Sequence, residues 1–77
     1  MQNIIVYTSP LCSRSKQVTD YLDSQGVVYT EYNVSDDREK ALEMVDKSDQ
    51  QGVPVLDIDG EIVIGFDINS IDELLEL

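Results

Sequence analysis

Short apolar runs alternate with helical patterns along the chain, and this alternation predicts its secondary structure. Residues 3–7 are mostly apolar and predict a first strand. Residues 13–25 predict a helix, because apolar side chains recur about one turn apart on one face: Val18, Tyr21 and Leu22. Gly26 is suited to end this helix in the left-handed conformation. Residues 27–34 are rich in β-branched and aromatic side chains, so they predict a second strand and complete a β-α-β unit.

Two more helices are predicted in the second half of the chain. Asp36 and Glu39 have the spacing of a capping box, and apolar positions continue one helical face to about residue 48. The last helix follows a glycine turn at residues 65–67, and its buried stripe is formed by apolar residues at helical spacing: Ile68, Ile71 and Leu75. Each helix therefore has one apolar face to set against a sheet.

A hairpin is predicted between these two helices. Residues 53–58 and 61–64 read as strands, and Asp59-Gly60 between them is a strong signal for a two-residue turn. The order is therefore β-α-β-α-β-β-α. With a right-handed crossover, this order gives an α/β fold with a four-stranded mixed sheet and helices on both faces. The architecture resembles the thioredoxin fold in its smallest form.

Composition narrows the possible functions. Seventy-seven residues make one domain, 1–77, and a formal charge of −11 disfavours nucleic acid or anionic membranes as partners. No apolar run is long enough to span a bilayer, and the start of the chain lacks the basic region of a secretory signal, so we expect a reducing, cytoplasmic setting. One cysteine and no histidine leave too few ligands for a zinc site, and no metal is expected.

The single cysteine, Cys12, is the main candidate for chemistry. It lies where the first strand gives way to a helix, so unpaired N–H groups and the helix dipole would favour its thiolate. Arg14 and Lys16 add two cations nearby. The alternative is a small buried cysteine beside ordinary surface charges. Ser15 lies one turn along the helix, where its hydroxyl could donate to the thiolate or to a helix carbonyl.

Two further segments are candidates for binding. Val53-Pro54 is either an ordinary start of a strand or a cis-proline turn that leaves the backbone of residue 53 free for an extended ligand. Gly65-Phe66-Asp67 opens the last helix, so Asp67 would cap that helix or accept a hydrogen bond from a ligand ammonium. Asp57 is either exposed or partly buried, and its sequence context does not distinguish the two.

Three motifs in order, at Tyr7–Ser15, Gly52–Val55 and Gly65–Asp67, make the chain similar to a glutaredoxin, closest to the small bacterial glutaredoxin-like proteins. The resemblance implies that Cys12 is the nucleophile and that Ser15 stands in the place of the resolving cysteine. It also implies that glutathione is the cosubstrate and contacts a set of residues around Cys12: Ser13, Arg14, Val53, Pro54 (as the cis-proline), Gly65, Phe66 and Asp67.

From this resemblance we expect a monomeric thiol–disulfide oxidoreductase. It would reduce glutathionylated proteins, and protein disulfides as a second substrate, through Cys12 alone. Two alternatives remain open. One is a dimeric carrier of a [2Fe–2S] cluster held by Cys12 and glutathione, which Cys-Ser-Arg-Ser disfavours because cluster-carrying relatives have Cys-Gly-Phe-Ser. The other is a redox-inactive binding module on a thioredoxin fold.

Overall fold

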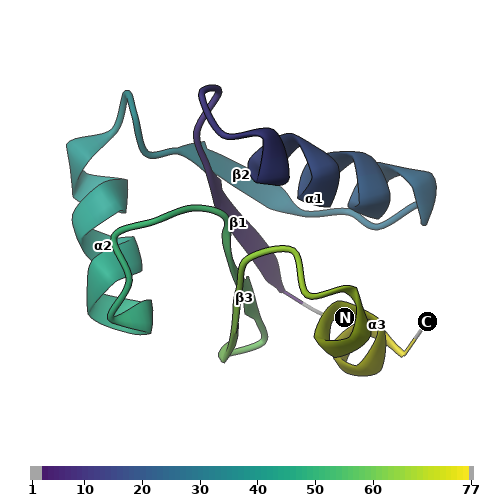
Figure 1. The fold of residues 1–77 in the computed structure, drawn as a ribbon. Helices are drawn as coiled ribbons and strands as arrows, with labels where there is room; N and C mark the ends of the chain where they lie inside the picture. Colours follow the sequence, from purple (N-terminus) through teal and green to yellow (C-terminus); the bar gives the residue numbers. More distant parts are fainter. Residues whose placement is uncertain (1–2, 77) are drawn as a thin grey trace.

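The computed structural model describes residues 3–76 and shows a four-stranded mixed sheet with three helices (Figure 1). The elements follow the predicted order: β1 (Ile4–Thr8), α1 (Ser13–Ser24), β2 (Thr30–Asn33), α2 (Arg38–Ser48), β3 (Val55–Ile58), β4 (Glu61–Ile64) and α3 (Ile68–Leu75). The strand order is β2-β1-β3-β4, with β1 parallel to β2 and antiparallel to β3, and β3 antiparallel to β4. The predicted thioredoxin-like fold is confirmed. Within the described range, no helix is both long and apolar enough to cross a bilayer.

Helices cover both faces of the sheet because alternate strand residues point to opposite sides. On one face, α1 and α3 pack over a core that includes Val6, Leu22, Leu56 and Ile71. On the other face, α2 covers a smaller core. That core contains Tyr7, Met44 and Val55. Figure 1 shows α2 on the opposite side of the sheet from α1 and α3. The start of α1 therefore lies at one end of β1, beside the sheet edge formed by β2.

The second strand is shorter than its sequence predicts. Residues 27–34 were expected to be extended throughout, but β2 contains only Thr30–Asn33. Val27 instead donates its N–H to Leu22 O at 3.0 Å, and Val28 is 89% exposed. These residues carry the chain from the end of α1 back to the sheet, so their β propensity is overridden by the connection they must make.

Turn and cap residues mostly agree with prediction. Gly26, which follows the C-cap residue Gln25 of α1, has φ +70°, and Asp59 and Gly60 both have positive φ, as a tight hairpin turn requires. The expected cap of α2 was wrong by one residue. Its first turn is capped by Asp37, whose carboxylate accepts from Lys40 N, and not by Asp36. A one-residue shift in where the helix begins is enough to exchange two adjacent aspartates.

A polar network joins α2 to the sheet. The hydroxyl of Tyr7, a fully buried residue, donates to Glu43 at 2.6 Å and accepts from Lys47 Nζ at 3.0 Å. Lys47 also pairs with Asp57 at 2.8 Å, so the partly buried alternative for Asp57 is correct. The tyrosine hydroxyl lowers the pKa of the Glu43 carboxyl. Hydrogen bonds from Lys47 and from the Gly60 N–H outweigh burial and lower the pKa of Asp57.

Candidate active site

A tight loop fixes Cys12 at the start of α1. Cys12 is the residue before the first helical turn, with φ −111° and ψ 116°, and its N–H donates to Ser9 O at 3.1 Å. The Ser9 hydroxyl accepts from Leu11 N at 3.3 Å and lies 2.7 Å from the Ser35 hydroxyl. Because each end of the loop is tied down, the Cys12 sulfur is held at the positive end of the helix.

The helix start stabilises the thiolate of Cys12. The Ser15 backbone N–H contributes most to lowering the pKa of the Cys12 thiol. The Ser15 hydroxyl and the N–H and charge of Arg14 add to this effect, whereas partial burial opposes it. The thiol is half-buried and is therefore not the enclosed structural cysteine of the alternative interpretation. A lowered pKa and incomplete burial are properties of a reactive thiol.

Ser15 is buried next to Cys12 and is not exposed to solvent. It is 2% exposed, and its hydroxyl oxygen accepts a hydrogen bond from Ser9 N at 3.4 Å. The hydroxyl also helps to lower the pKa of the Cys12 thiol, which is the first of the two roles predicted for it. A serine here can stabilise the thiolate but cannot form a disulfide with it.

The two cations near Cys12 in the sequence act differently on its thiol. Arg14 is exposed, and its charge lowers the pKa of Cys12. Lys16 instead forms an ion pair with Asp20 at 3.2 Å, and it is not among the causes of that shift. Ser13, the first residue of α1, is exposed. Arg14 is therefore the cation that is available to an anion beside the sulfur.

The Val53-Pro54 segment lies directly beside the sulfur. The Cys12 thiol donates to the Val53 carbonyl at 3.5 Å, although the two residues are 41 positions apart in the chain. The Val53-Pro54 peptide bond is cis. Within residues 3–76 the N–H of Val53 has no hydrogen-bond partner. A backbone group is thus available to an extended ligand next to Cys12, as the second of the two sequence alternatives requires.

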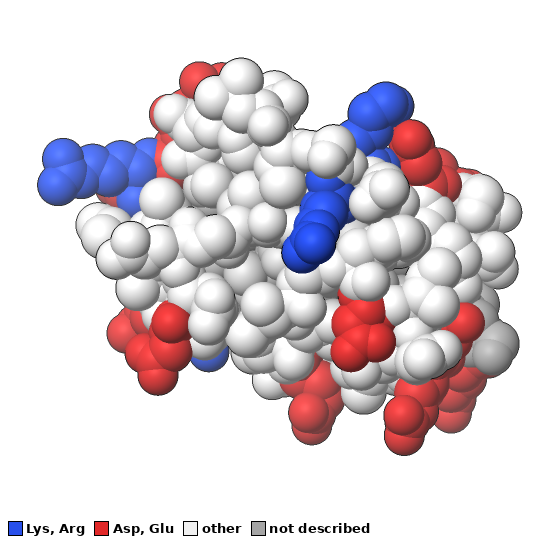
Figure 2. Space-filling model, viewed as in Figure 1, with Lys and Arg blue, Asp and Glu red and all other residues white. Residues whose placement is uncertain are grey.

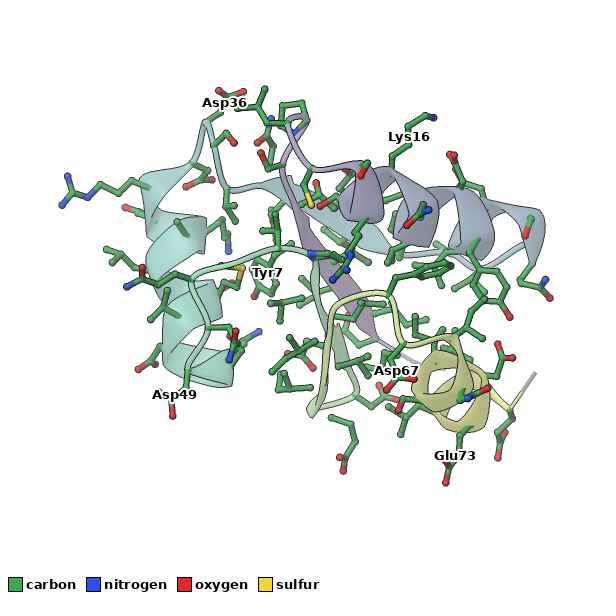
Figure 3. The ribbon with its side chains drawn as sticks, viewed as in Figure 1. Tyr7, Lys16, Asp36, Asp49, Asp67 and Glu73 are labelled. Carbon is green, nitrogen blue, oxygen red and sulfur yellow. The ribbon has the colours of Figure 1, made fainter. Side chains whose placement is uncertain are left out.

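The turn at residues 65–67 is joined to the same segment. Gly65 has φ +77° and donates its N–H to Pro54 O at 2.9 Å. Phe66 packs edge-on against Tyr21, with ring centroids 6.1 Å apart. Asp67 caps α3: its carboxylate accepts from Ser70 N at 3.3 Å and from the Ser70 hydroxyl at 2.9 Å. The carboxylate remains exposed at the start of α3 (Figure 3).

A pocket of about 340 Å³ opens on the other side of Cys12. We call it the β2-side pocket, and its lining includes Thr8, Cys12, Ser15, Lys16, Glu31 and Asn33. Sequence reasoning missed Thr8, Glu31 and Asn33 as site residues. These residues could have been found from the parallel register of β1 and β2. That register pairs Val6 with Glu31 and Thr8 with Asn33, so all four side chains lie on the face of the sheet that α1 covers.

The chain belongs to the glutaredoxin family, whose family model matches residues 4–63. It is 41% identical over 73 residues to an uncharacterised glutaredoxin-like 8.6 kDa protein in the rubredoxin operon of Clostridium pasteurianum, covering 95% of this chain and 97% of that one. A crystal structure of the thioredoxin-like protein BC3987, as its T8A mutant, has a TM-score of 0.92 at 33% identity, covering 99% and 97% of the two chains.

A buckwheat glutaredoxin, solved as a complex with glutathione, has the same fold at 17% identity. Its TM-score is 0.76, and the match covers 94% of this chain and 68% of that one. Family membership and the activated sulfur of Cys12 together indicate thiol oxidoreductase chemistry in general.

Proposed function

We propose that this protein is a glutathione-dependent oxidoreductase that reduces protein–glutathione mixed disulfides through Cys12 alone, in a reducing, cytoplasmic setting. One observation carries the proposal. The Cys12 sulfur, whose pKa is lowered by the α1 start, lies 3.5 Å from the Val53 carbonyl, beside a Val53 N–H that has no partner within residues 3–76. The buckwheat relative, solved as a complex with glutathione, supports the choice of cosubstrate.

In this proposal, glutathione contacts three parts of the site. The Val53 backbone pairs with the cysteine residue of glutathione, as in the addition of an extended strand. Arg14 binds the glycyl carboxylate of glutathione. Among the described residues Arg14 has no ion pair, so its guanidinium group can pair with this carboxylate. The turn at residues 65–67 holds the γ-glutamyl end of glutathione. Asp67 faces the ammonium group of that end, and backbone N–H groups of the turn lie near its carboxylate.

The reaction has two exchange steps. The Cys12 thiolate attacks the glutathione sulfur of a glutathionylated protein, the S–S bond breaks, and the protein thiolate leaves and takes up a proton. A second glutathione thiolate then attacks the bound glutathione sulfur, which releases oxidised glutathione and the Cys12 thiolate. Ser15 keeps the thiolate stable but cannot displace glutathione from it. A protein disulfide would therefore be reduced only with glutathione as the second thiol.

The test is a mass measurement of the intact protein after incubation with oxidised glutathione. We expect one glutathione adduct that is removed by reductant, and none in Cys12→Ala. Ser15→Cys is the informative companion, because a thiol at this buried position beside Cys12 should displace glutathione and leave an internal disulfide. An unmodified wild-type protein would reject the proposal. So would failure to turn over a glutathionylated peptide in the presence of reduced glutathione.

A further inference from the structure

The β2-side pocket shares Cys12 with the proposed glutathione site but lies on the opposite side of the sulfur. Neither Val53-Pro54 nor the turn at residues 65–67 lines it. Lys16, which does line it, and Asp67 lie on opposite sides of the N-terminal end of α1 in Figure 3. A molecule in this pocket would reach the sulfur from the sheet edge formed by β2.

The charges in the pocket favour a cationic ligand. Glu31 forms no ion pair with any lysine or arginine in residues 3–76. The hydroxyl of Thr8, a residue that is 3% exposed, donates to the Glu31 carboxylate at 2.7 Å, and this hydrogen bond orients the carboxylate. Lys16 also lines the pocket, but it is paired with Asp20 at 3.2 Å, which offsets part of its charge. The lining of the pocket thus includes both the Cys12 sulfur and a carboxylate that Thr8 orients and that has no ion pair among the described residues.

The charge of the whole protein adds to this preference only weakly. Figure 2 shows acidic side chains along the lower rim of the molecule, away from the start of α1, whereas basic side chains are also visible in the upper half. A net charge of −11 attracts any cation to the protein at low salt. A specific site must therefore be distinguished from this general field, and the control variant below is chosen for that purpose.

We propose that the β2-side pocket binds disulfides of small aminothiols, with an ammonium group at Glu31 and a sulfur at Cys12. The Cys12 thiolate attacks that sulfur and the disulfide bond breaks. One aminothiol becomes joined to Cys12, and the other leaves as a thiolate that is protonated by water. Cys12 is oxidised and the leaving sulfur is reduced, so no other oxidant is needed. The inference shares the nucleophile with the proposed function but uses none of the residues proposed to bind glutathione, apart from Cys12.

The experiment compares cystamine, which carries ammonium groups, with neutral 2-hydroxyethyl disulfide. Second-order rate constants for modification of Cys12 are measured by intact mass in wild type, in Glu31→Gln and in Glu73→Gln. Glu73 is an exposed residue on α3, far from the pocket (Figure 3), and its replacement changes the net charge equally. We expect Glu31→Gln to lower the cystamine rate relative to the neutral disulfide by about fivefold at low salt, and less at high salt.

Two results would overturn the inference. One is an equal loss in Glu31→Gln and Glu73→Gln, which would assign the preference to the general field. The other is a wild-type protein that reacts no faster with cystamine than with the neutral disulfide. Oxidised glutathione serves as a third reagent, and its rate should not change in Glu31→Gln beyond the change in Glu73→Gln. If glutathione forms no adduct while cystamine reacts with the expected dependence on Glu31, the proposed function fails and this inference stands.

Discussion

Replacing Asp67 by asparagine and by alanine separates its role as a helix cap from its proposed role in binding glutathione. The carboxylate accepts two hydrogen bonds from Ser70, one from the backbone and one from the hydroxyl. Asparagine caps helices about as well as aspartate, whereas alanine does not. Only the carboxylate, however, carries the charge that would meet a γ-glutamyl ammonium group.

The two roles predict different magnitudes. Asp67→Ala removes an N-cap, which costs about 1 kcal/mol of unfolding free energy and lowers the Tm of a domain of this size by about 4–8 °C. Asp67→Asn loses only the favourable interaction of a charge with the α3 dipole, a few tenths of a kcal/mol. An exposed carboxylate–ammonium pair contributes at most about 1 kcal/mol. Both variants should therefore react with oxidised glutathione up to about fivefold more slowly.

Thermal unfolding by circular dichroism measures the first effect, and the rate of adduct formation at Cys12 measures the second. The neutral 2-hydroxyethyl disulfide is the control reagent, and its rate should be the same in all three proteins. A wild-type rate with oxidised glutathione in Asp67→Asn would refute the binding role. An equal loss of Tm in Asp67→Asn and Asp67→Ala would refute the capping argument.

Three further predictions concern protons and hydrogen bonds. Ser15→Ala should raise the pKa of Cys12 without restoring its ordinary value, because the residue 15 N–H remains; the pH dependence of iodoacetamide alkylation measures this, and an unchanged profile contradicts it. Tyr7→Phe should lower the free energy of unfolding in urea by about 1–3 kcal/mol, since two partly buried hydrogen bonds to charged groups are lost, and glutathione reactivity should be unchanged. Folding lowers the pKa values of the Glu43 and Asp57 carboxyls, so their ionised forms stabilise the folded protein at a pH above their unfolded pKa values. This stabilisation is lost as the pH falls below about 4. Urea midpoints at neutral and acid pH test this, and Glu43→Gln should flatten the dependence.

The fold was largely predictable because its signals are local. The spacing of Val18 and Leu22 set the buried face of α1, and both residues are fully buried in the core. Asp59-Gly60 formed the expected turn. Two predictions were wrong, the extended strand at Val28 and the residue that caps α2. In both places the local sequence preference was overridden by the way the chain connects one element to the next. Neither error changes the strand order, because pairing depends on the apolar pattern of whole strands.

The sequence by itself determined that one cysteine, Cys12, begins a helix at the end of a strand, since capping and periodicity are properties of neighbouring residues. The tertiary structure decided what surrounds its sulfur. Val53 approaches from a segment 41 residues away, and Glu31 shares the pocket because β2 aligns with β1 in a particular register. Such contacts depend on which strands pair and on how the helices pack, which bring distant segments together, and the pattern of one segment alone does not specify its neighbours.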